Sequence, residues 1–212
     1  MTNPLKWGIL STGGIADQFT RDVLRLPDHR VVAVGSRELS RANDFADRFA
    51  IKNRHGNYQD LFNDPEVDAI YVATHHPLHA RDTIAALEAG KPVLCEKPFA
   101  MSYAETQAMV ETARKKNLLL MEAMWARYLP HMIRIREIIA SGILGEIISV
   151  RADHGQWFKL DPEFRLFKAE LGGGALFDLG VYPISFAHMV LGSPEKITAR
   201  SSKAFKIGRA HV

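Results

Sequence analysis

The chain has 212 residues and a formal net charge of +3, and its basic and acidic residues are interleaved along most of its length. With 47% hydrophobic and 24% charged residues it has the composition of an ordinary folded domain, without the basic stripe of a nucleic-acid-binding protein or the run of about 20 apolar residues that spans a membrane. We therefore expect no nucleic-acid partner and no membrane, and the single cysteine, Cys95, favours a reducing, cytoplasmic location because it cannot form an internal disulfide.

Short runs rich in valine and isoleucine alternate with segments of helical periodicity in the first half of the chain. The predicted strands are residues 5–10, 30–36, 68–74, 92–95 and 117–121. The predicted helices are residues 15–26, 40–49, 78–89 and 103–116. This alternation is typical of parallel strands joined by crossover helices. We predict an α/β fold whose N-terminal domain, residues 1–122, is a doubly wound parallel sheet of the Rossmann type.

The alternation of short apolar runs with helical segments ends after Glu122, where we place the domain boundary. The elements predicted beyond it are a helix at 126–140, a strand at 147–152, a segment of mixed glycine and helical character at 172–191, and a final strand at 196–200. Residues 123–206 therefore form a second, incomplete α/β domain that is expected to bind the substrate.

A glycine turn joins the first predicted strand to the first predicted helix. It reads Ser11-Thr12-Gly13-Gly14-Ile15 and is followed by Ala16. Such a turn directs backbone N–H groups at a helix start towards a pyrophosphate. In the Gly-x-Gly-x-x-Gly/Ala fingerprint, Gly13 and Ala16 fill the second and third positions, whereas Ser11 replaces the first glycine. The turn predicts a dinucleotide site, with a plain strand-to-helix connection as the alternative.

The end of the second predicted strand distinguishes NAD from NADP. An acidic residue about 20 positions beyond the turn binds the ribose hydroxyl of NAD. This chain has Ser36 and Arg37 there, and Arg41 follows four residues later. Two guanidinium groups suit the 2′-phosphate of NADP. We predict NADP, with NAD as the second choice; the alternative is that both arginines solvate a helix start and pair with Glu38.

Three further motifs complete a recognisable set. Cys95-Glu96-Lys97-Pro98 ends a predicted strand, Thr74-His75-His76-Pro77-Leu78-His79 follows another, and Gly172-Gly173-Gly174 leads to Asp178 and Tyr182. In order and spacing, these motifs resemble those of the Gfo/Idh/MocA oxidoreductase family. Within that family the chain is most similar to the branch of dimeric dihydrodiol dehydrogenases and NADP-dependent D-xylose dehydrogenases, which also has tyrosine where many members have histidine.

That resemblance implies an NADP-dependent dehydrogenase that transfers a hydride between a sugar or cyclic diol carbinol and nicotinamide. It also implies a second domain built on an open, mostly antiparallel sheet, and a homodimer. The acid/base pair in that branch matches Lys97 and Tyr182. The residues that match its cofactor surroundings are Arg37, Arg41, Thr74, His76, His79 and Glu96. Relatives include regulatory proteins that bind a dinucleotide without turnover, and this is the alternative function.

Lys97 and Tyr182 suit carbinol oxidation, in which hydride leaves carbon while a base takes the hydroxyl proton. Either Tyr182 transfers the proton with the Lys97 ammonium beside it, or Lys97 transfers it and Tyr182 orients the substrate. A solvated loop lysine and a core tyrosine are the structural alternative. Asp178 stands one helical turn before Tyr182 and is expected to bind a sugar hydroxyl, although Pro183 disfavours helical geometry at Tyr182. The histidines have no cysteine or carboxylate close by, so we expect no metal site.

The last six residues, 207–212, read Ile-Gly-Arg-Ala-His-Val and correspond to one reading frame of a common sequencing adapter. We expect a non-native tail there, so that the native sequence ends near Lys206 within the second domain. A domain interrupted in this way exposes apolar surface and an unpaired sheet edge. We therefore expect low activity from the chain alone.

Overall fold

The computed structural model describes residues 3–200, so the predicted tail at 207–212 lies outside the described residues. The chain divides into two compact units, one ending at Ala123 and the other beginning at Met124. Among the described residues, all strands belong to the first unit, and the second unit is formed by helices and irregular segments.

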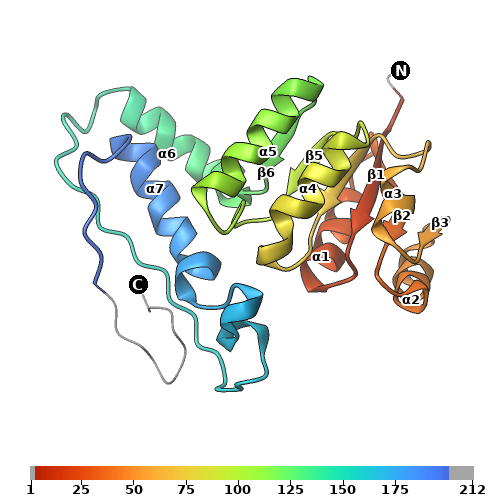
Figure 1. Ribbon diagram of the computed structural model, residues 1–212. Helices are drawn as coiled ribbons and strands as arrows, with labels where there is room; N and C mark the ends of the chain where they lie inside the picture. The colour runs from red at the N-terminus through yellow and green to blue at the C-terminus, as the bar shows by residue number, and fades with distance from the viewer. Residues whose placement is uncertain (1–2, 201–212) are drawn as a thin grey trace. The chain divides into compact units, whose positions relative to one another are not determined.

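The first unit is built on a parallel sheet, which has six strands within residues 3–200 and the order β3-β2-β1-β4-β5-β6 (Figure 1). The strands are β1 Leu5–Leu10, β2 His29–Gly35, β3 Asn53–His55, β4 Ala69–Val72, β5 Val93–Cys95 and β6 Leu120–Glu122. The chain moves outward from β1 in both directions, so the strand order reverses beside β1, where open α/β sheets bind their ligands. The predicted Rossmann-like parallel sheet is confirmed.

Five helices cover the two faces of this sheet. They are α1 Gly14–Val23, α2 Leu39–Phe49, α3 Tyr58–Phe62, α4 His79–Glu88 and α5 Tyr103–Lys116. Successive strand residues point to opposite faces. Ile9 packs with Phe45 of α2 on one face, whereas Leu10 packs with Leu61 of α3 and Met109 of α5 on the other. Both core clusters are continuous, so the unit has a buried core on each side of the sheet.

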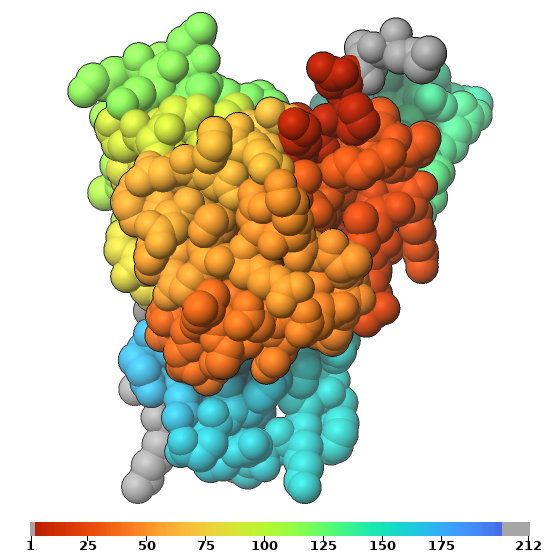
Figure 2. Space-filling model, turned by 90° about the vertical axis from the view of Figure 1, so that its right-hand side faces the viewer, coloured from red at the N-terminus to blue at the C-terminus, as the bar shows by residue number. Residues whose placement is uncertain are grey.

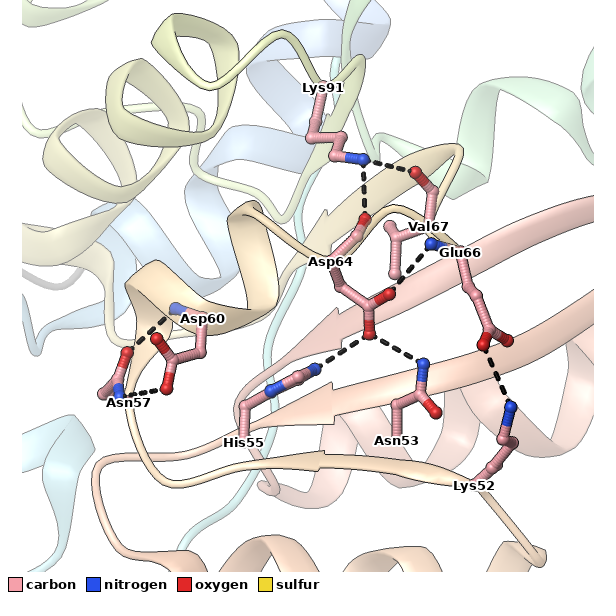
Figure 3. A network of polar contacts seen from close by, with 9 residues as sticks. All are labelled: Lys52, Asn53, His55, Asn57, Asp60, Asp64, Glu66, Val67 and Lys91. Carbon is pink, nitrogen blue, oxygen red and sulfur yellow. Dashed lines mark hydrogen bonds and ion pairs between the residues drawn. The ribbon is translucent and has the colours of Figure 1, made fainter.

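β3 is a short polar strand that the hydrophobic pattern does not predict. It lies at the edge of the sheet, on the surface formed by α2, β3 and α3 (Figure 2, orange). The buried Asp64 carboxylate accepts a hydrogen bond from Asn53 Nδ2 at 2.8 Å and lies 2.9 Å from His55 Nε2 (Figure 3). β3 is therefore held to the next loop by polar contacts instead of apolar side chains.

The same loop is tied to the segment before β5. Lys91 Nζ donates hydrogen bonds to the carbonyl oxygens of Asp64 at 2.8 Å and Val67 at 2.7 Å (Figure 3). Burial by itself raises the pKa of Asp64, but hydrogen bonds from His55, from the Glu66 N–H and from Asn53 outweigh it, so the pKa is lowered. A carboxylate with this many donors is stabilised in its ionised form.

The second unit contains two α-helices within the described residues. They are α6 Pro130–Ala140 and α7 Val181–Leu191. Four shorter helical turns of this unit are Trp125–Tyr128, Arg165–Phe167, Ala169–Leu171 and the π-turn Leu176–Gly180. The predicted helix at 126–140 thus begins later, because Pro130 occupies a first-turn position where its missing N–H costs nothing.

The strands predicted at 147–152 and 196–200 are not formed. An extended segment becomes a strand only when a neighbour pairs with its N–H and C=O groups. The described residues of the second unit provide no such neighbour, and the side chains of Ile148 and Ile197 are each 81% exposed. The pattern of the sequence was that of a strand, but the pairing on which a strand depends is absent from residues 124–200.

The glycine-rich segment Gly172-Gly173-Gly174 leads into the turn that precedes α7. A Cβ on Gly173 would lie 2.7 Å from each of three backbone carbonyl oxygens, so glycine is required there. The π-turn Leu176–Gly180 then widens the helix, which continues through Tyr182 and Pro183. The expectation that Pro183 disfavours helical geometry at Tyr182 is wrong, because a proline in the first turn after a widened turn avoids a clash with the preceding carbonyl groups.

One stretch, Ala169–Leu191, is long and apolar enough by length and composition to cross a membrane, and 11% of its most apolar window is buried. This finding covers residues 3–200. The same stretch contains Asp178, whose carboxylate pairs with Arg165 at 3.3 Å. One such helix is weak evidence for a membrane, and the absence of a membrane partner stays a prediction.

Candidate active site

The glycine turn follows β1 directly and leads into α1. Gly13 is the residue before the helix, its backbone is extended, and no side chain caps the first turn. A Cβ on Gly14 would meet no atom within 4 Å, so the approach to this turn is open. The uncapped N–H groups at the start of α1, including that of Ile15, therefore form a donor set suited to a pyrophosphate.

Ser11 occupies the position of the first fingerprint glycine with a φ of 101°. This is the left-handed region of backbone space, which glycine enters easily and other residues rarely adopt. The Ser11 Oγ accepts a hydrogen bond of 3.4 Å from the Gly13 N–H. The backbone thus keeps the conformation that the fingerprint requires, although the glycine is missing.

Arg37 and Arg41 lie beyond the carboxyl end of β2. Arg41 Nε pairs with Glu38 Oε2 at 3.2 Å, which is the pairing that the alternative interpretation of these arginines expects. Arg37 is exposed and directly follows the buried Ser36. Arg37 is therefore the better placed of the two to meet a phosphate, whereas Arg41 would have to leave Glu38 or share it.

Thr74 stands beyond β4, at the same edge of the sheet. Its hydroxyl is buried and has no hydrogen-bond partner within residues 3–200. Buried hydroxyl groups are normally satisfied. The orphaned Thr74 Oγ1, the open glycine turn and the arginines after β2 together fit a bound dinucleotide.

His79 joins the Thr74 loop to the Lys97 loop. It is fully buried, with its Nδ1 2.7 Å from the Pro98 carbonyl oxygen and its Nε2 2.9 Å from the Thr74 carbonyl oxygen. Burial lowers the pKa of His79, and the two carbonyl groups oppose that effect. The neutral imidazole donates to one carbonyl at a time. His76, also buried, lies edge-on to this ring at 5.7 Å.

The segment that carries Lys97 is fixed by two carboxylates. Tyr71 donates its hydroxyl hydrogen to Glu96 Oε1, and the Lys97 N–H donates to Glu96 Oε2 at 3.1 Å. The Phe99 N–H donates to Glu122 Oε1 at 3.0 Å, and the Lys97–Pro98 peptide bond is cis. Burial raises the pKa of Glu96, and the hydrogen bond from Tyr71 opposes it. Glu96 holds the backbone of the loop.

In the second unit, Tyr182 lies at the start of α7. Its hydroxyl oxygen accepts a hydrogen bond of 2.9 Å from Trp125 Nε1, and its ring lies 5.0 Å from that of His154. Asp178 is buried in the π-turn and pairs with Arg165. Trp125, His154 and Arg165 belong to no motif of the sequence, so sequence patterns alone do not predict these contacts.

The structure gathers the predicted cofactor residues at one edge of one sheet. Ser11, Arg37, Thr74 and Glu96 follow the carboxyl ends of β1, β2, β4 and β5. Lys97 belongs to the first unit, and Asp178 and Tyr182 belong to the second. The pairing of Lys97 with Tyr182, and the contact of each residue with cofactor or substrate, stay predictions. Within residues 3–200, no group of three or more histidine, cysteine, aspartate or glutamate residues is placed to hold a metal ion.

Known proteins resemble this chain along most of its length. A trans-1,2-dihydrobenzene-1,2-diol dehydrogenase from Mus musculus is 42% identical over 211 residues, covering 98% of this chain and 61% of that protein. A D-xylose 1-dehydrogenase (NADP(+)) from Hypocrea jecorina is 44% identical over 208 residues, covering 88% of this chain and 53% of that protein. The chain thus spans about three fifths of the length of the curated relatives it matches.

Solved structures agree with these relatives. The 3-ketoreductase KijD10 from Actinomadura kijaniata, in complex with NADP and TDP-benzene, has a TM-score of 0.77 and 34% identity, covering 90% of this chain and 58% of that one. A levoglucosan dehydrogenase in complex with NADH and levoglucosan has a TM-score of 0.78 and 26% identity, covering 90% of this chain and 54% of that one. Residues 5–124 match the oxidoreductase family with the NAD-binding Rossmann fold, and residues 132–209 match the Gfo/Idh/MocA C-terminal domain. The chain therefore belongs to the Gfo/Idh/MocA family of oxidoreductases.

Proposed function

We propose that the protein is an NADP-dependent dehydrogenase that transfers a hydride between a carbinol carbon of a sugar or cyclic diol and nicotinamide. The observation that carries this proposal is the gathering of the glycine turn, Arg37, Thr74 and the Lys97 loop at the carboxyl edge of one parallel sheet. The names of the relatives, a diol dehydrogenase and a D-xylose dehydrogenase, support the substrate class.

The residues after β2 support NADP as the preferred cofactor. Ser36 and Arg37 stand where NAD-binding proteins place an acidic residue, and a guanidinium group suits a dianionic phosphate. The xylose dehydrogenase is named for NADP(+) and the KijD10 structure contains NADP, whereas the levoglucosan dehydrogenase structure contains NADH. NAD is therefore the second choice.

The chemistry assigned to Lys97 and Tyr182 follows from what the reaction requires. When bound, the nicotinamide accepts or returns the hydride. In oxidation, Tyr182 takes the carbinol proton, with the Lys97 ammonium stabilising the phenolate and Trp125 Nε1–H donating to the same oxygen. In the other arrangement, Lys97 takes the proton and Tyr182 orients the hydroxyl group. Asp178, held by Arg165, binds a second hydroxyl of the substrate in either arrangement.

The direct test is a panel of aldoses and trans-diols assayed against NADP and NAD. We expect NADPH to form, at a low rate, with at least one carbinol. Lys97→Met and Tyr182→Phe should each lower kcat by about 100-fold or more while NADPH still binds. The matched controls Lys115→Met and Tyr103→Phe change exposed residues of α5 and should retain activity. The dependence of kcat on pH in Lys97→Met and Tyr182→Phe then distinguishes the two arrangements. The variant that lacks the proton-transfer group should lose the pH dependence that this group causes, whereas the other variant should keep it.

The second candidate function is a dinucleotide-binding regulatory protein without turnover. The open glycine turn supports dinucleotide binding in both cases, and only catalysis separates them. Tight NADPH binding with no reduction of NADP by any substrate of the panel would favour the regulatory protein. The presence of both Lys97 and Tyr182 favours the enzyme.

We also propose a cytoplasmic protein with a small-molecule substrate and no nucleic-acid or membrane partner. We propose that its second domain contributes to an open, mostly antiparallel sheet that serves as a homodimer surface. The match of residues 132–209 to the family's C-terminal domain and the exposure of Ile148 and Ile197 support the sheet. Sedimentation equilibrium tests the dimer, and a monomer at all concentrations would contradict it.

A further inference from the structure

Tyr71 lies in β4, beside β1 in the sheet, and 1% of its surface is exposed. Its hydroxyl group donates a hydrogen bond to Glu96 Oε1, and the other oxygen of that carboxylate, Oε2, accepts the Lys97 N–H at 3.1 Å. Glu96 is buried as well, with 7% of its surface exposed. One buried carboxylate therefore joins the phenol of Tyr71 to the backbone of Lys97.

The ring of Tyr71 is held by the helix that follows the glycine turn. Phe19 of α1 stacks on it, with 3.7 Å between the ring centroids and 15° between the ring planes. Trp7 of β1 meets the Phe19 ring edge-on at 5.4 Å. Stacked rings in a close-packed interior have little freedom to move. The phenol is therefore a fixed donor for Glu96.

The groups around Glu96 explain why its carboxylate needs this donor. Burial raises the pKa of Glu96, and the Glu122 carboxylate raises it further. The hydrogen bond from Tyr71 is the largest effect that lowers this pKa, followed by the N–H and the charge of Lys97. Burial and the Glu96 charge raise the pKa of Tyr71, and burial raises the pKa of the Cys95 thiol to about 12, so both keep their protons. Without the Tyr71 hydroxyl group, Glu96 would more readily take up a proton and would then accept the Lys97 N–H more weakly.

The position of the Lys97 backbone decides where its ammonium group lies. A misplacement of about 1 Å can lower the rate of an enzyme by about 100-fold. We propose that Tyr71 is a positioning residue for the reaction, which fixes the Lys97 backbone through the Glu96 carboxylate. This assignment rests on the proposed function, because it requires Lys97 in catalysis. Tyr71 itself transfers neither hydride nor proton.

NMR of the Lys97 amide in the full chain tests this link without a substrate. An amide proton that donates to a carboxylate changes its chemical shift when the carboxylate is protonated, so the Lys97 signal follows Glu96. Tyr71→Phe keeps the buried ring and removes only the hydroxyl group. We expect it to move the midpoint of this titration to higher pH by about one pH unit. Glu96→Gln should abolish the titration, which identifies the titrating group.

Tyr58→Phe is the matched control, because Tyr58 is a half-buried tyrosine that packs in the core on the opposite face of the sheet. It should change neither the midpoint nor kcat. In Tyr71→Phe we expect kcat to fall by about tenfold at neutral pH, while the affinity for NADPH changes by less than about threefold. If Tyr71 acts through Glu96, adding Tyr71→Phe to Glu96→Gln should lower kcat by less than about twofold further.

Three results would overturn the assignment: an unmoved midpoint in Tyr71→Phe, an unchanged kcat in the same variant, or fully additive losses of kcat in the double variant. Urea unfolding shows whether a loss of kcat comes from a loss of fold. If the wild-type chain reduces NADP with no carbinol, the proposed function fails. The NMR midpoint still decides in that case whether Tyr71 fixes the Lys97 backbone, so the two failures are distinguishable.

Discussion

Ser11 sits in the left-handed region, with a φ of 101°, at the position where the dinucleotide fingerprint has glycine. A side chain in this region costs on the order of 1 kcal/mol or more. Ser11 lies in the turn between β1 and α1, next to the site at which the pyrophosphate is expected.

Replacing Ser11 with glycine should therefore stabilise the protein. We expect Ser11→Gly to raise the free energy of unfolding by roughly 1 kcal/mol, measured by urea denaturation. Ser11→Ala is the control, since it removes the hydroxyl group but keeps a Cβ at the same φ, and it should be no more stable than the wild type. Equal stabilities of the two variants would show that the backbone at residue 11 is not strained.

Arg37 is the residue on which the choice of NADP depends. Arg37→Asp removes the guanidinium group and introduces the acidic residue that binds a ribose hydroxyl in NAD-dependent proteins. We expect NADPH binding to weaken by about 100-fold and NADH binding to change by less than about threefold. An equal loss of affinity for NADPH and NADH would contradict the assignment of Arg37 to the 2′-phosphate.

Single residues of the site were predictable where a motif fixes them. The glycine turn, Arg37 and the Glu96-Lys97-Pro98 segment follow strands, and a parallel sheet brings strand ends to one edge. Trp125 is not predictable in this way, because an aromatic residue beside a domain boundary is usually packed in a core. Only its indole N–H, which needs an acceptor, indicates the hydrogen bond to Tyr182.

At the scale of elements, the hydrophobic pattern predicts those strands that are buried by apolar side chains. β1, β2 and β4 have such runs, and the structure places them at the centre of the sheet. β3 has none, because the Asp64 network fixes it, and a hydrogen-bond network between residues distant in sequence leaves no periodic signal. The strands predicted at 147–152 and 196–200 are not formed for the opposite reason: their pattern is that of a strand, but within residues 3–200 no segment pairs with them.

The Asp64 network should contribute a pH-dependent part of the stability. The pKa of Asp64 is lowered in the folded state, so the folded protein binds its proton less readily than the unfolded chain. The contribution is therefore complete above the ordinary aspartate pKa of 3.8 and is lost as the pH falls through the lower pKa of the folded state. At neutral pH we expect Asp64→Asn to lose about 2 kcal/mol of unfolding free energy.

Urea denaturation of Asp64→Asn and wild type at several pH values measures this difference. The difference in unfolding free energy between wild type and Asp64→Asn should be largest near neutral pH. It should decrease below the pKa that Asp64 has in the unfolded chain. Asp44→Asn, an exposed change on α2, is the control and should follow the wild type at every pH. A gap that stays constant from neutral to acid pH would show that the charge of Asp64 makes no contribution.

At the scale of the whole molecule, the two units differ in how far the sequence specifies them. The first unit has a core on both faces of its sheet, so the alternation of strands and helices was enough to predict its architecture. The described part of the second unit has few fully buried apolar side chains, and its helices were predicted but its strands were not. The family supplied the expectation of a sheet there, since periodicity cannot show which segments pair.

The proposed dehydrogenase depends on the binding of NADP to its first unit. Equilibrium titration of the chain with NADPH and NADH, followed by the fluorescence of the reduced nicotinamide, measures this binding and requires no substrate. We expect saturable binding of one dinucleotide per chain, with NADPH bound more tightly than NADH. Failure of both dinucleotides to saturate, or tighter binding of NADH, would contradict it.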